Sequence, residues 1–539
     1  MEDRWDGAVE GRFAAYVGKL VGVIGHADRA EPLKDYCTGL LLPVERKSVE
    51  PLAAAVRPDR VSAKHQSLLH FVGQGGWSDE ALMGCVREQV LPVVERDGPV
   101  EAWIVDDTGF PKKGKHSVGV ARQYCGERGK TENCQVMVSL SVATEAASLP
   151  IAHRLFLPES WTKDAERRRK ARIPDDVVFQ TKGEIALDQI RAALEQGIPR
   201  GVVLGDAGYG GGAEFRDALT KLGLAYSVAV RPITNVWRPG EAPPPRRRKH
   251  RRGPWPKGTA VEPHSYQPVQ AKVLARDLPE SAWTTIAWRE GSNARLSSRF
   301  ALMRLCCANG DGIRFDPSPE EWLLIEWPDG EPEPVRFWLS TLPAKTSPSE
   351  LVRITKMRWR IERDYLDLKQ ECGLGHYEGR GWRGFHHHIS LCVAAYGFLI
   401  SETETIPPSA PESPIFRQKP ALPEGYRPRG AAPEAATALP SLNRNPTRPP
   451  GPCNRQPIAA MSLLPNGPFK TRICDAVVVL YPRNSSPGSP TEPGTRSPAK
   501  RRPPRMSPRI CLTSGCFSIG SPMKWCPPCN GSPKKSWWT

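Results

Sequence analysis

The sequence predicts an α/β fold in which a mixed sheet, flanked by helices, is interrupted by a β-rich insertion. Two short apolar runs, at residues 102–105 and 201–205, each lead directly into aspartate. Between them, residues 134–143 alternate apolar and polar side chains as a half-buried strand does. Helical spacing precedes this pattern, and a Pro-rich stretch follows it. We therefore expect a helical N-terminal region, a central α/β core and a disordered C-terminal tail.

Residues 1–95 are expected to be helical. Apolar residues recur at helical spacing around Leu40, Leu52 and Leu68, and turn signals separate these segments. Two short helices on either side of Arg57-Pro58-Asp59 would form a helix-turn-helix, which makes this a possible DNA-binding region. A helical cap on the core that follows explains the same pattern equally well.

Residues 96–230 are expected to form the first part of the core. An antiparallel meander is predicted from three strands, at Ala102–Val105, His116–Tyr124 and Cys134–Ala143. A helix around Ile185–Leu194 then leads to strands at Gly201–Gly205 and Ala225–Val230. Three hairpin-like strands followed by helix, strand, helix and strand is the order expected of an RNase H-like sheet.

Residues 231–345 interrupt that order with a predicted β-rich insertion. It opens with a Pro- and Arg-rich stretch at Pro243–Lys257, and strand-like segments follow at Trp283–Trp288 and Phe300–Leu305. Trp322–Trp327 and Val335–Leu339 are expected to pair as a hairpin through Pro328-Asp329-Gly330. Residues 346–405 return to the core with two predicted helices, at Ser347–Glu371 and His386–Ser401.

Residues 406–539 are expected to be a disordered, basic tail. Residues 401–539 hold 28 of the 56 prolines, and their 19 Lys and Arg against 7 Asp and Glu give a net charge of +12. Such a composition buries too little apolar surface to offset chain entropy. The abrupt change also suits a reading frame that runs past its ancestral end.

Composition bounds the function classes. The chain has 539 residues, enough for two or three domains, and its net charge of +17 favours a polyanionic partner. No N-terminal stretch resembles a secretory signal, and no apolar run reaches the roughly 20 residues that span a bilayer. We expect a cytoplasmic protein with no membrane partner. Its 14 cysteines lack a spacing framework, which favours reduced thiols.

Three acidic residues are the candidate catalytic groups. Asp106 and Asp206 each follow a buried strand, where two carboxylates are costly unless a cation joins them. On the helix predicted near residue 360, four side chains share one face at spacings of four, three and four: Arg358, Glu362, Tyr365 and Lys369. Taken singly, turn aspartates and a solvated helix face explain these residues better.

Several motifs together carry a family resemblance. The strings Val105-Asp106-Asp107-Thr108-Gly109 and Asp206-Ala-Gly-Tyr-Gly210 resemble the acidic motifs of bacterial insertion-sequence transposases of the DDE type. Arg358, Glu362 and Lys369 match the branch of that family with the signature Tyr-x2-Arg-x3-Glu-x6-Lys, although Thr355 stands where the signature has Tyr. The resemblance covers roughly residues 5–405.

The resemblance implies an enzyme that cleaves DNA at insertion-sequence ends and joins the 3′ ends to target DNA. Asp106, Asp206 and Glu362 would hold two Mg²⁺ (or Mn²⁺) ions for in-line phosphodiester chemistry. Asp107 is the rival to Asp106 because the doublet can slip by one, and the family pattern favours Asp106. Double-stranded DNA is the expected partner, a homodimer the expected synaptic form, and the bacterial nucleoid the expected location. The alternative is an inactive remnant that only binds transposon ends.

Basic and aromatic residues complete the prediction. The expected DNA-backbone contacts are Lys112, Lys113, Arg246, Arg247, Arg248, Arg358 and Lys369, together with Arg167–Lys170. Three tryptophans of the insertion, Trp288, Trp322 and Trp327, are candidates to stack on an exposed base, although core packing is the better explanation for most of them. His386–His388 point in different directions on a helix and cannot share one ion, so we expect them to pack and to contact the DNA backbone.

Overall fold

The computed structural model describes residues 2–242, 267–290, 295–309, 316–317 and 319–405. All of these belong to one compact unit of the chain. The predicted tail and the Arg246–Arg248 run lie outside the described residues. No described helix is long and apolar enough to cross a membrane.

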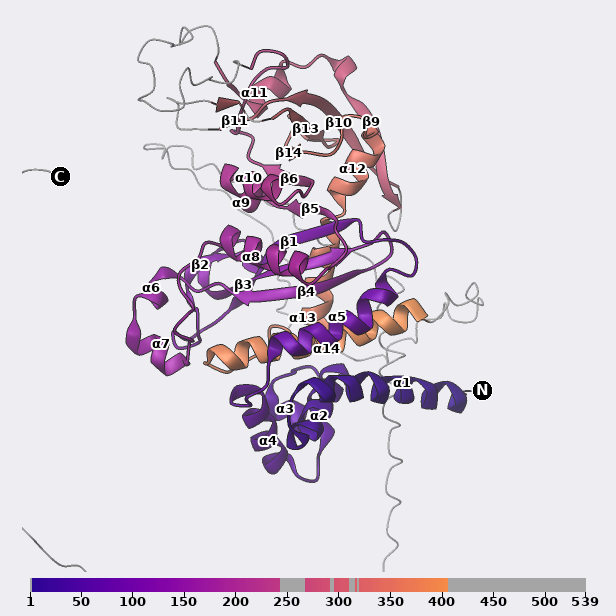
Figure 1. The fold of residues 1–539 in the computed structure, drawn as a ribbon, viewed down its shortest axis with the longest axis vertical. Helices are drawn as coiled ribbons and strands as arrows, with labels where there is room; N and C mark the ends of the chain where they lie inside the picture. Colours follow the sequence, from indigo (N-terminus) through magenta and orange to yellow (C-terminus); the bar gives the residue numbers. More distant parts are fainter. Residues whose placement is uncertain (1, 243–266, 291–294, 310–315, 318, 406–539) are drawn as a thin grey trace, which may run out of the picture. The chain divides into compact units, whose positions relative to one another are not determined.

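A ten-stranded mixed sheet forms the centre of the described unit, with strand order β2-β3-β1-β5-β6-β14-β13-β10-β9 and β4 paired to β3 (Figure 1). Of the strand pairs in the described residues, only β1–β5 and β5–β6 are parallel. The order β4-β3-β1-β5-β6 is consistent with the predicted RNase H-like core. Its strands are β1 (Ala102–Pro111), β2 (Ala121–Cys125), β3 (Lys130–Ala143), β4 (Ser148–Leu155), β5 (Val202–Gly205) and β6 (Tyr226–Val230).

The meander differs from its prediction in three places. β1 continues through Asp106 to Pro111, because the long β3 pairs with it over its whole length. The strand predicted at His116–Tyr124 is wrong for residues 116–120, and β2 begins at Ala121. β4 was not predicted; its first residues are buried without alternation, so no period of two marks it.

The insertion extends the central sheet. Its β14 pairs antiparallel with β6, and β13, β10 and β9 follow in turn. The predicted hairpin is confirmed by the β13–β14 pair. The elements are β7 (Asn235–Val236), β8 (Val269–Gln270), α11 (Ala271–Arg276), β9 (Thr284–Glu290), β10 (Arg295–Leu305), β11 (Ala308–Asn309), β12 (Asp316–Pro317), β13 (Glu321–Trp327) and β14 (Arg336–Ser340).

Helices cover both faces of the core part of the sheet. On one side α8 packs against β3, and on the other α13, α14 and α5 pack against β4 (Figure 1). The helices outside the N-terminal region are α6 (Glu159–Thr162), α7 (Ala165–Ala171), α8 (Lys182–Glu195), α9 (Ala207–Gly210), α10 (Ala213–Lys221), α12 (Pro348–Lys356), α13 (Trp359–Gln370) and α14 (Trp382–Thr405).

The helix predicted at Ser347–Glu371 is two helices. Ser347 caps α12 by accepting from the Glu350 amide, and α12 ends at Lys356. α13 starts only at Trp359, so Arg358 lies in the turn rather than inside a helix. The break has a packing reason: α12 contacts β9 and β6, whereas α13 contacts β4 and β1.

The N-terminal region is helical, as predicted, and packs on α14. Its helices are α1 (Glu2–Val23), α2 (Ala30–Leu41), α3 (Val49–Val56), α4 (Val61–Gly73) and α5 (Asp79–Val94). α14 contacts α2, α4 and α5 as well as β4, so it lies between this region and the sheet (Figure 1). The long apolar face of α14 is therefore buried from several directions.

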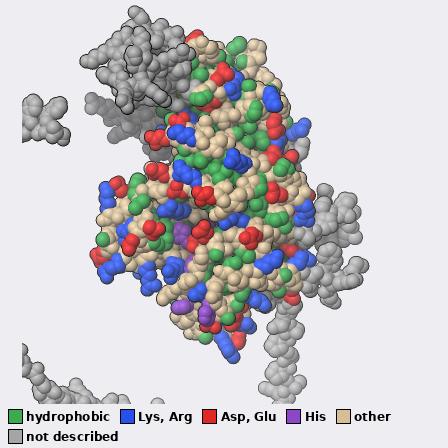
Figure 2. Space-filling model, in the orientation of Figure 1, with side chains coloured by type: hydrophobic (Ala, Val, Ile, Leu, Met, Phe, Trp, Pro, Cys, Tyr) green, Lys and Arg blue, Asp and Glu red, His purple; other side chains and the backbone are tan. Residues whose placement is uncertain are grey.

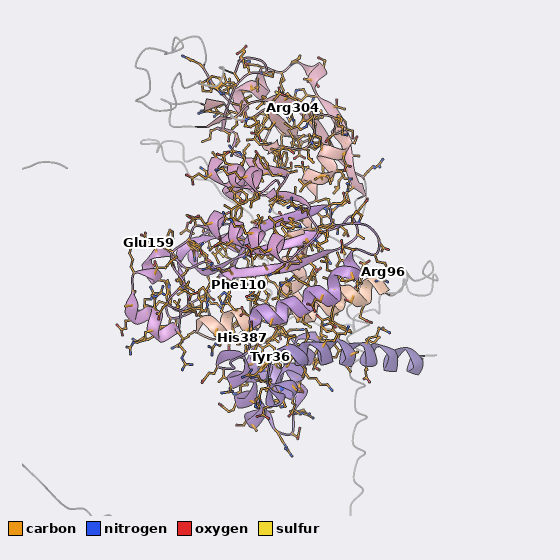
Figure 3. The ribbon with its side chains drawn as sticks, viewed as in Figure 1. Tyr36, Arg96, Phe110, Glu159, Arg304 and His387 are labelled. Carbon is orange, nitrogen blue, oxygen red and sulfur yellow. The ribbon has the colours of Figure 1, made fainter. Side chains whose placement is uncertain are left out.

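The three consecutive histidines of α14 are buried packing residues. Nδ1 and Nε2 of His387 lie 3.0 and 3.1 Å from the backbone carbonyl oxygens of Val72 and Trp77, which accept from the ring N–H. The ring also stacks on Trp77 with 3.5 Å between centroids. His388 bonds the Tyr36 hydroxyl at 2.9 Å, and His387 and Tyr36 both lie where α14 meets the N-terminal helices (Figure 3). The packing expectation is confirmed. Contact with DNA is wrong, because His386–His388 are 6%, 2% and 0% exposed.

Candidate active site

Asp106 and Asp206 stand at the same level on neighbouring parallel strands. The register pairs Ile104 with Leu204, so each aspartate lies two residues beyond that pair. β5 ends at Gly205, and Asp206 becomes the N-cap of α9: its Oδ1 accepts from the amides of Gly208 at 2.8 Å and Tyr209 at 3.3 Å. Among the described residues, no donor is bonded to its Oδ2.

Gly210 fixes how the second acidic motif sits on the sheet. A Cβ at this position would meet the Ala229 carbonyl oxygen at 2.1 Å and the Val228 side chain at 2.8 Å. Only glycine allows α9 to approach β6 this closely. The close approach fixes the short turn that carries Asp206. Gly210 therefore helps to position the carboxylate, although it has no reactive side chain.

Arg358 joins the candidate carboxylates. Its guanidinium donates to Asp106 Oδ2 and to Glu362 Oε1, both at 2.8 Å. Because Arg358 precedes α13 and Glu362 lies in its first turn, the side chains reach the same point above β1. Two of the three acidic residues predicted from the sequence therefore bond one cation, and the third, Asp206, is close enough to raise the pKa of Arg358 electrostatically.

Charge is incompletely balanced at Asp106. Burial raises the pKa of its carboxyl to about 7; Arg358 lowers it, whereas Asp206 and Asp107 raise it further. Burial opposes the charge of Arg358 as well, yet Asp106, Glu362 and Asp206 together raise the pKa of the guanidinium. The site thus carries more negative charge than one arginine offsets, which favours binding of an additional cation.

Asp107 faces a different partner. Strand alternation turns it away from Asp106, and its Oδ2 lies 2.9 Å from Lys182 Nζ. Lys182 is the first residue of α8, whose start is fixed by a capping box between Thr181 and Glu184. Sequence reasoning missed Lys182, because it lies 75 residues from Asp107 and no local motif marks it.

The shared face of α13 is confirmed. Tyr365 bonds the Ser139 hydroxyl at 2.6 Å, and Ser139 is the β3 partner of Asp106. Lys369 donates to the Gly109 carbonyl at 3.0 Å and pairs with Glu127 at 2.6 Å. Thr355, which replaces the signature tyrosine, is buried and bonds the Ser227 hydroxyl at 2.6 Å.

Comparison with known proteins agrees with this geometry. The family described as DDE superfamily endonuclease matches residues 19–295, about half of the chain. The chain belongs to this DDE endonuclease superfamily. It is also 30% identical, over 202 residues, to a probable transposase for insertion sequence element IS701 from Microchaete diplosiphon. That alignment covers 37% of this chain and 49% of the relative, so the chain spans about half the length of the curated protein it matches.

The matched segment of the DDE endonuclease includes Asp106 and Asp206 and ends before Glu362. The third carboxylate is therefore supported by its place in the structure and by its spacing from Arg358 and Lys369. It comes to the site from beyond the insertion, on the helix that follows β14 and α12.

The donor chemistry of the site fits a divalent cation, because carboxylate oxygens are the ligands that Mg²⁺ prefers. The carboxylates converge on Arg358, and in the described part of the chain no three His, Cys, Asp or Glu side chains are grouped to hold an ion without rearrangement. Arg358 thus neutralises part of the negative charge that would otherwise bind an ion.

The basic residues proposed to contact DNA have varied surroundings. Lys112 donates to the Tyr377 carbonyl at 2.6 Å, and burial lowers its pKa. Lys113 is exposed, whereas Arg358 and Lys369 are both paired with acidic side chains. Arg246, Arg247 and Arg248 lie outside the described residues.

The three candidate tryptophans are engaged inside the insertion. Trp322 donates to the Pro343 carbonyl, and Trp327 packs edge-on against Trp283 at 5.2 Å. Trp288 packs edge-on against Phe300 and also lines a cavity of about 260 Å³ with Arg289, Lys356 and Trp359.

Proposed function

We propose that the protein is an insertion-sequence transposase that cleaves DNA at the element's ends and joins the 3′ ends to target DNA. The observation that carries the proposal is the convergence of Asp106, Asp206 and Glu362 around Arg358 in a member of the DDE endonuclease superfamily. The similarity to a probable transposase supports the same activity.

The spacing of Arg358, Glu362 and Lys369 supports membership of the branch with the signature Tyr-x2-Arg-x3-Glu-x6-Lys. Arg358, Glu362 and Lys369 fill three of its four positions and face β1 together. Thr355 fills the fourth and is buried against Ser227, so it cannot make the DNA contact of a tyrosine. Any such contact in this chain comes from another residue.

Asp106, Asp206 and Glu362 would hold two Mg²⁺ (or Mn²⁺) ions, which supply charge stabilisation for in-line displacement at phosphorus. Arg358 would then exchange its carboxylate partners for oxygens of the DNA phosphate, which its planar fork of donors matches equally well. Water attacks the phosphodiester at the transposon end, and the bond from phosphorus to the 3′ oxygen breaks. The freed 3′ hydroxyl attacks a phosphodiester of the target and displaces its 3′ oxygen in turn.

Cleavage and joining of the element's own end fragments tests this function. The full chain is incubated with labelled end duplexes and a plasmid target in Mg²⁺ and in EDTA, beside a Glu362→Gln variant. We expect nicked ends and strand-transfer products only for the unsubstituted chain in Mg²⁺. Nicking without joining would indicate a hydrolytic nuclease, and binding without nicking an inactive end-binding protein; either result contradicts the proposal.

A further inference from the structure

A pocket lined by Lys and Arg side chains lies outside the candidate active site. It has a volume of about 280 Å³ and is formed by three separate segments: the loop between β1 and β2, the α6–α7 region, and the stretch before α14. Figure 2 shows Lys and Arg side chains among those that cover the α6–α7 region. The lining residues are Lys115, His116, Trp161, Arg167, Lys170, Ala171 and Arg380.

Hydrogen bonds between the backbone and two of these side chains build the pocket. Arg167 donates to the Lys115 carbonyl, and Trp161 donates to the Val120 carbonyl at 2.8 Å. The Val118 amide donates to the Arg380 carbonyl at 3.2 Å, which ties the loop to the third segment. The Arg167 guanidinium also stacks on the Trp161 ring, 3.8 Å from its centroid. Three segments that are distant in sequence are thereby held in one arrangement.

The charge of the pocket is one-sided. Among the described residues that line it, four are Lys or Arg and none is acidic. Lys170 pairs with Glu166 outside the lining, but within the described residues neither Lys115 nor Arg380 pairs with a carboxylate. Like charges held close together repel, so such a group gains most from an anion that bridges it.

We propose that this pocket binds a backbone phosphate of duplex DNA, at a distance from the phosphate that reacts. The proposal rests on the proposed function for its choice of anion. Position supports it: the loop that carries Lys115 begins where β1 ends at Pro111, five residues beyond Asp106. At about 3.4 Å per strand residue, the point where this loop leaves β1 lies roughly 17 Å from Asp106.

Salt-dependent binding tests the pocket. Fluorescence anisotropy of a labelled 30-base-pair duplex is followed in EDTA, over a range of salt concentrations, for the full chain and for a Lys115→Ala/Arg380→Ala variant. Among the described residues neither side chain makes a hydrogen bond or ion pair that its loss would break, and thermal melting checks the fold. We expect affinity to fall about tenfold and the slope of log K against log salt to fall by about one.

A Lys163→Ala/Arg172→Ala variant is the matched control, because it removes the same charge from exposed positions directly after α6 and α7 that do not line the pocket. It should keep the slope of the unsubstituted chain. An unchanged slope for Lys115→Ala/Arg380→Ala, or an equal loss in the control, overturns the proposal. The assay contains no metal and measures binding rather than cleavage. A chain that fails to cleave or join DNA can therefore still show whether the pocket binds phosphate.

Discussion

Asp106 and Asp107 are adjacent carboxylates whose partners differ, and this difference separates their expected roles. Asp106 faces Arg358 and the other two carboxylates, whereas Asp107 is held by Lys182. We expect Asp106→Asn to lower the rate of end cleavage by at least about a thousandfold, since the amide keeps the shape and loses the charge. Single-turnover cleavage of labelled ends measures the effect.

Asp107→Asn is the matched control for that substitution. It should retain most of the cleavage rate, because it removes an ion pair with Lys182 and leaves the Arg358 cluster intact. Both variants should bind end DNA with unchanged affinity. The reverse pattern, a dead Asp107→Asn and an active Asp106→Asn, would move the catalytic assignment by one residue.

Tyr365 holds α13 against the strand behind Asp106. Its hydroxyl and that of Ser139 are both buried and lie 2.6 Å apart. Tyr365→Phe should lower the free energy of unfolding by about 1–2 kcal/mol, because a buried hydroxyl loses its partner. Urea denaturation measures this, and Ser139→Ala should show a similar loss.

A double-mutant cycle distinguishes this bond from general packing effects. If the two hydroxyls act on each other, Tyr365→Phe/Ser139→Ala should cost less than the sum of the single losses. Strict additivity would show that the bond contributes nothing to the placement of α13.

At the scale of elements, the turn between α12 and α13 lets two helices serve different parts of the sheet. Lys356, the last residue of α12, pairs with Glu326 of β13 at 2.6 Å and lies 4.6 Å from the centroid of the Trp288 ring. Burial lowers the pKa of Lys356 despite this pairing. Two residues later, Arg358 turns to Asp106. A single straight helix could not present both cations to these partners.

Lys356 therefore links the insertion to α12, the helix that leads into α13 and Glu362. Lys356→Met should lower the free energy of unfolding by about 3 kcal/mol, because Glu326 is 2% exposed and would lose its buried partner. Arg336→Met removes the other cation beside Glu326, but Arg336 is 60% exposed, so its loss should cost less than about 1 kcal/mol. Equal losses in chemical denaturation would contradict this account.

The sequence predicts elements that have a local period or a local motif. The core of β1, β3, β5 and the β13–β14 hairpin follow from apolar patterning, and the candidate carboxylates from motif spacing. Pairing between strands that are far apart in the sequence has no such local pattern and could not be predicted. The β14–β6 ladder joins residues more than 100 positions apart, so the sequence does not show that the insertion extends the core sheet. Lys182 and Glu127 reach the site through the same kind of distant contact.

At the scale of the whole described unit, α14 joins the N-terminal helices to the sheet through buried imidazoles. His387 and His388 face the N-terminal region, whereas Nε2 of His386 accepts from the Leu155 amide of β4 and its ring stacks with that of His153. Burial lowers the pKa of His153, His387 and His388 to about 4 in each case. All three are thus neutral in the folded protein near pH 7.

This burial makes the contact between the layers sensitive to acid. An unfolded histidine takes up its proton near pH 6.5, whereas these three stay neutral in the folded state until about pH 4. Between those values the unfolded state binds more protons, so their contribution to stability is complete above pH 6.5 and is lost as the pH falls toward 4. Asp106 and Asp364, whose pKa values burial raises to about 7 and about 6, act in the opposite direction.

A comparison of variants isolates the histidine contribution, since the carboxyl contributions are common to both proteins. His387→Gln keeps a side chain that can hydrogen-bond to the Val72 or Trp77 carbonyl but cannot take up a proton. At pH 7.5 we expect it to be less stable than the unsubstituted chain by about 1–2 kcal/mol, because the stacking on Trp77 is lost. Below pH 6.5 its unfolding free energy should fall less steeply, by up to about 1.4 kcal/mol per pH unit. The two stability curves, measured by urea unfolding at pH 7.5, 6 and 5, should therefore converge toward acid. Parallel curves would show that His387 does not titrate differently in the folded and unfolded states, and that acid acts on this junction through other groups.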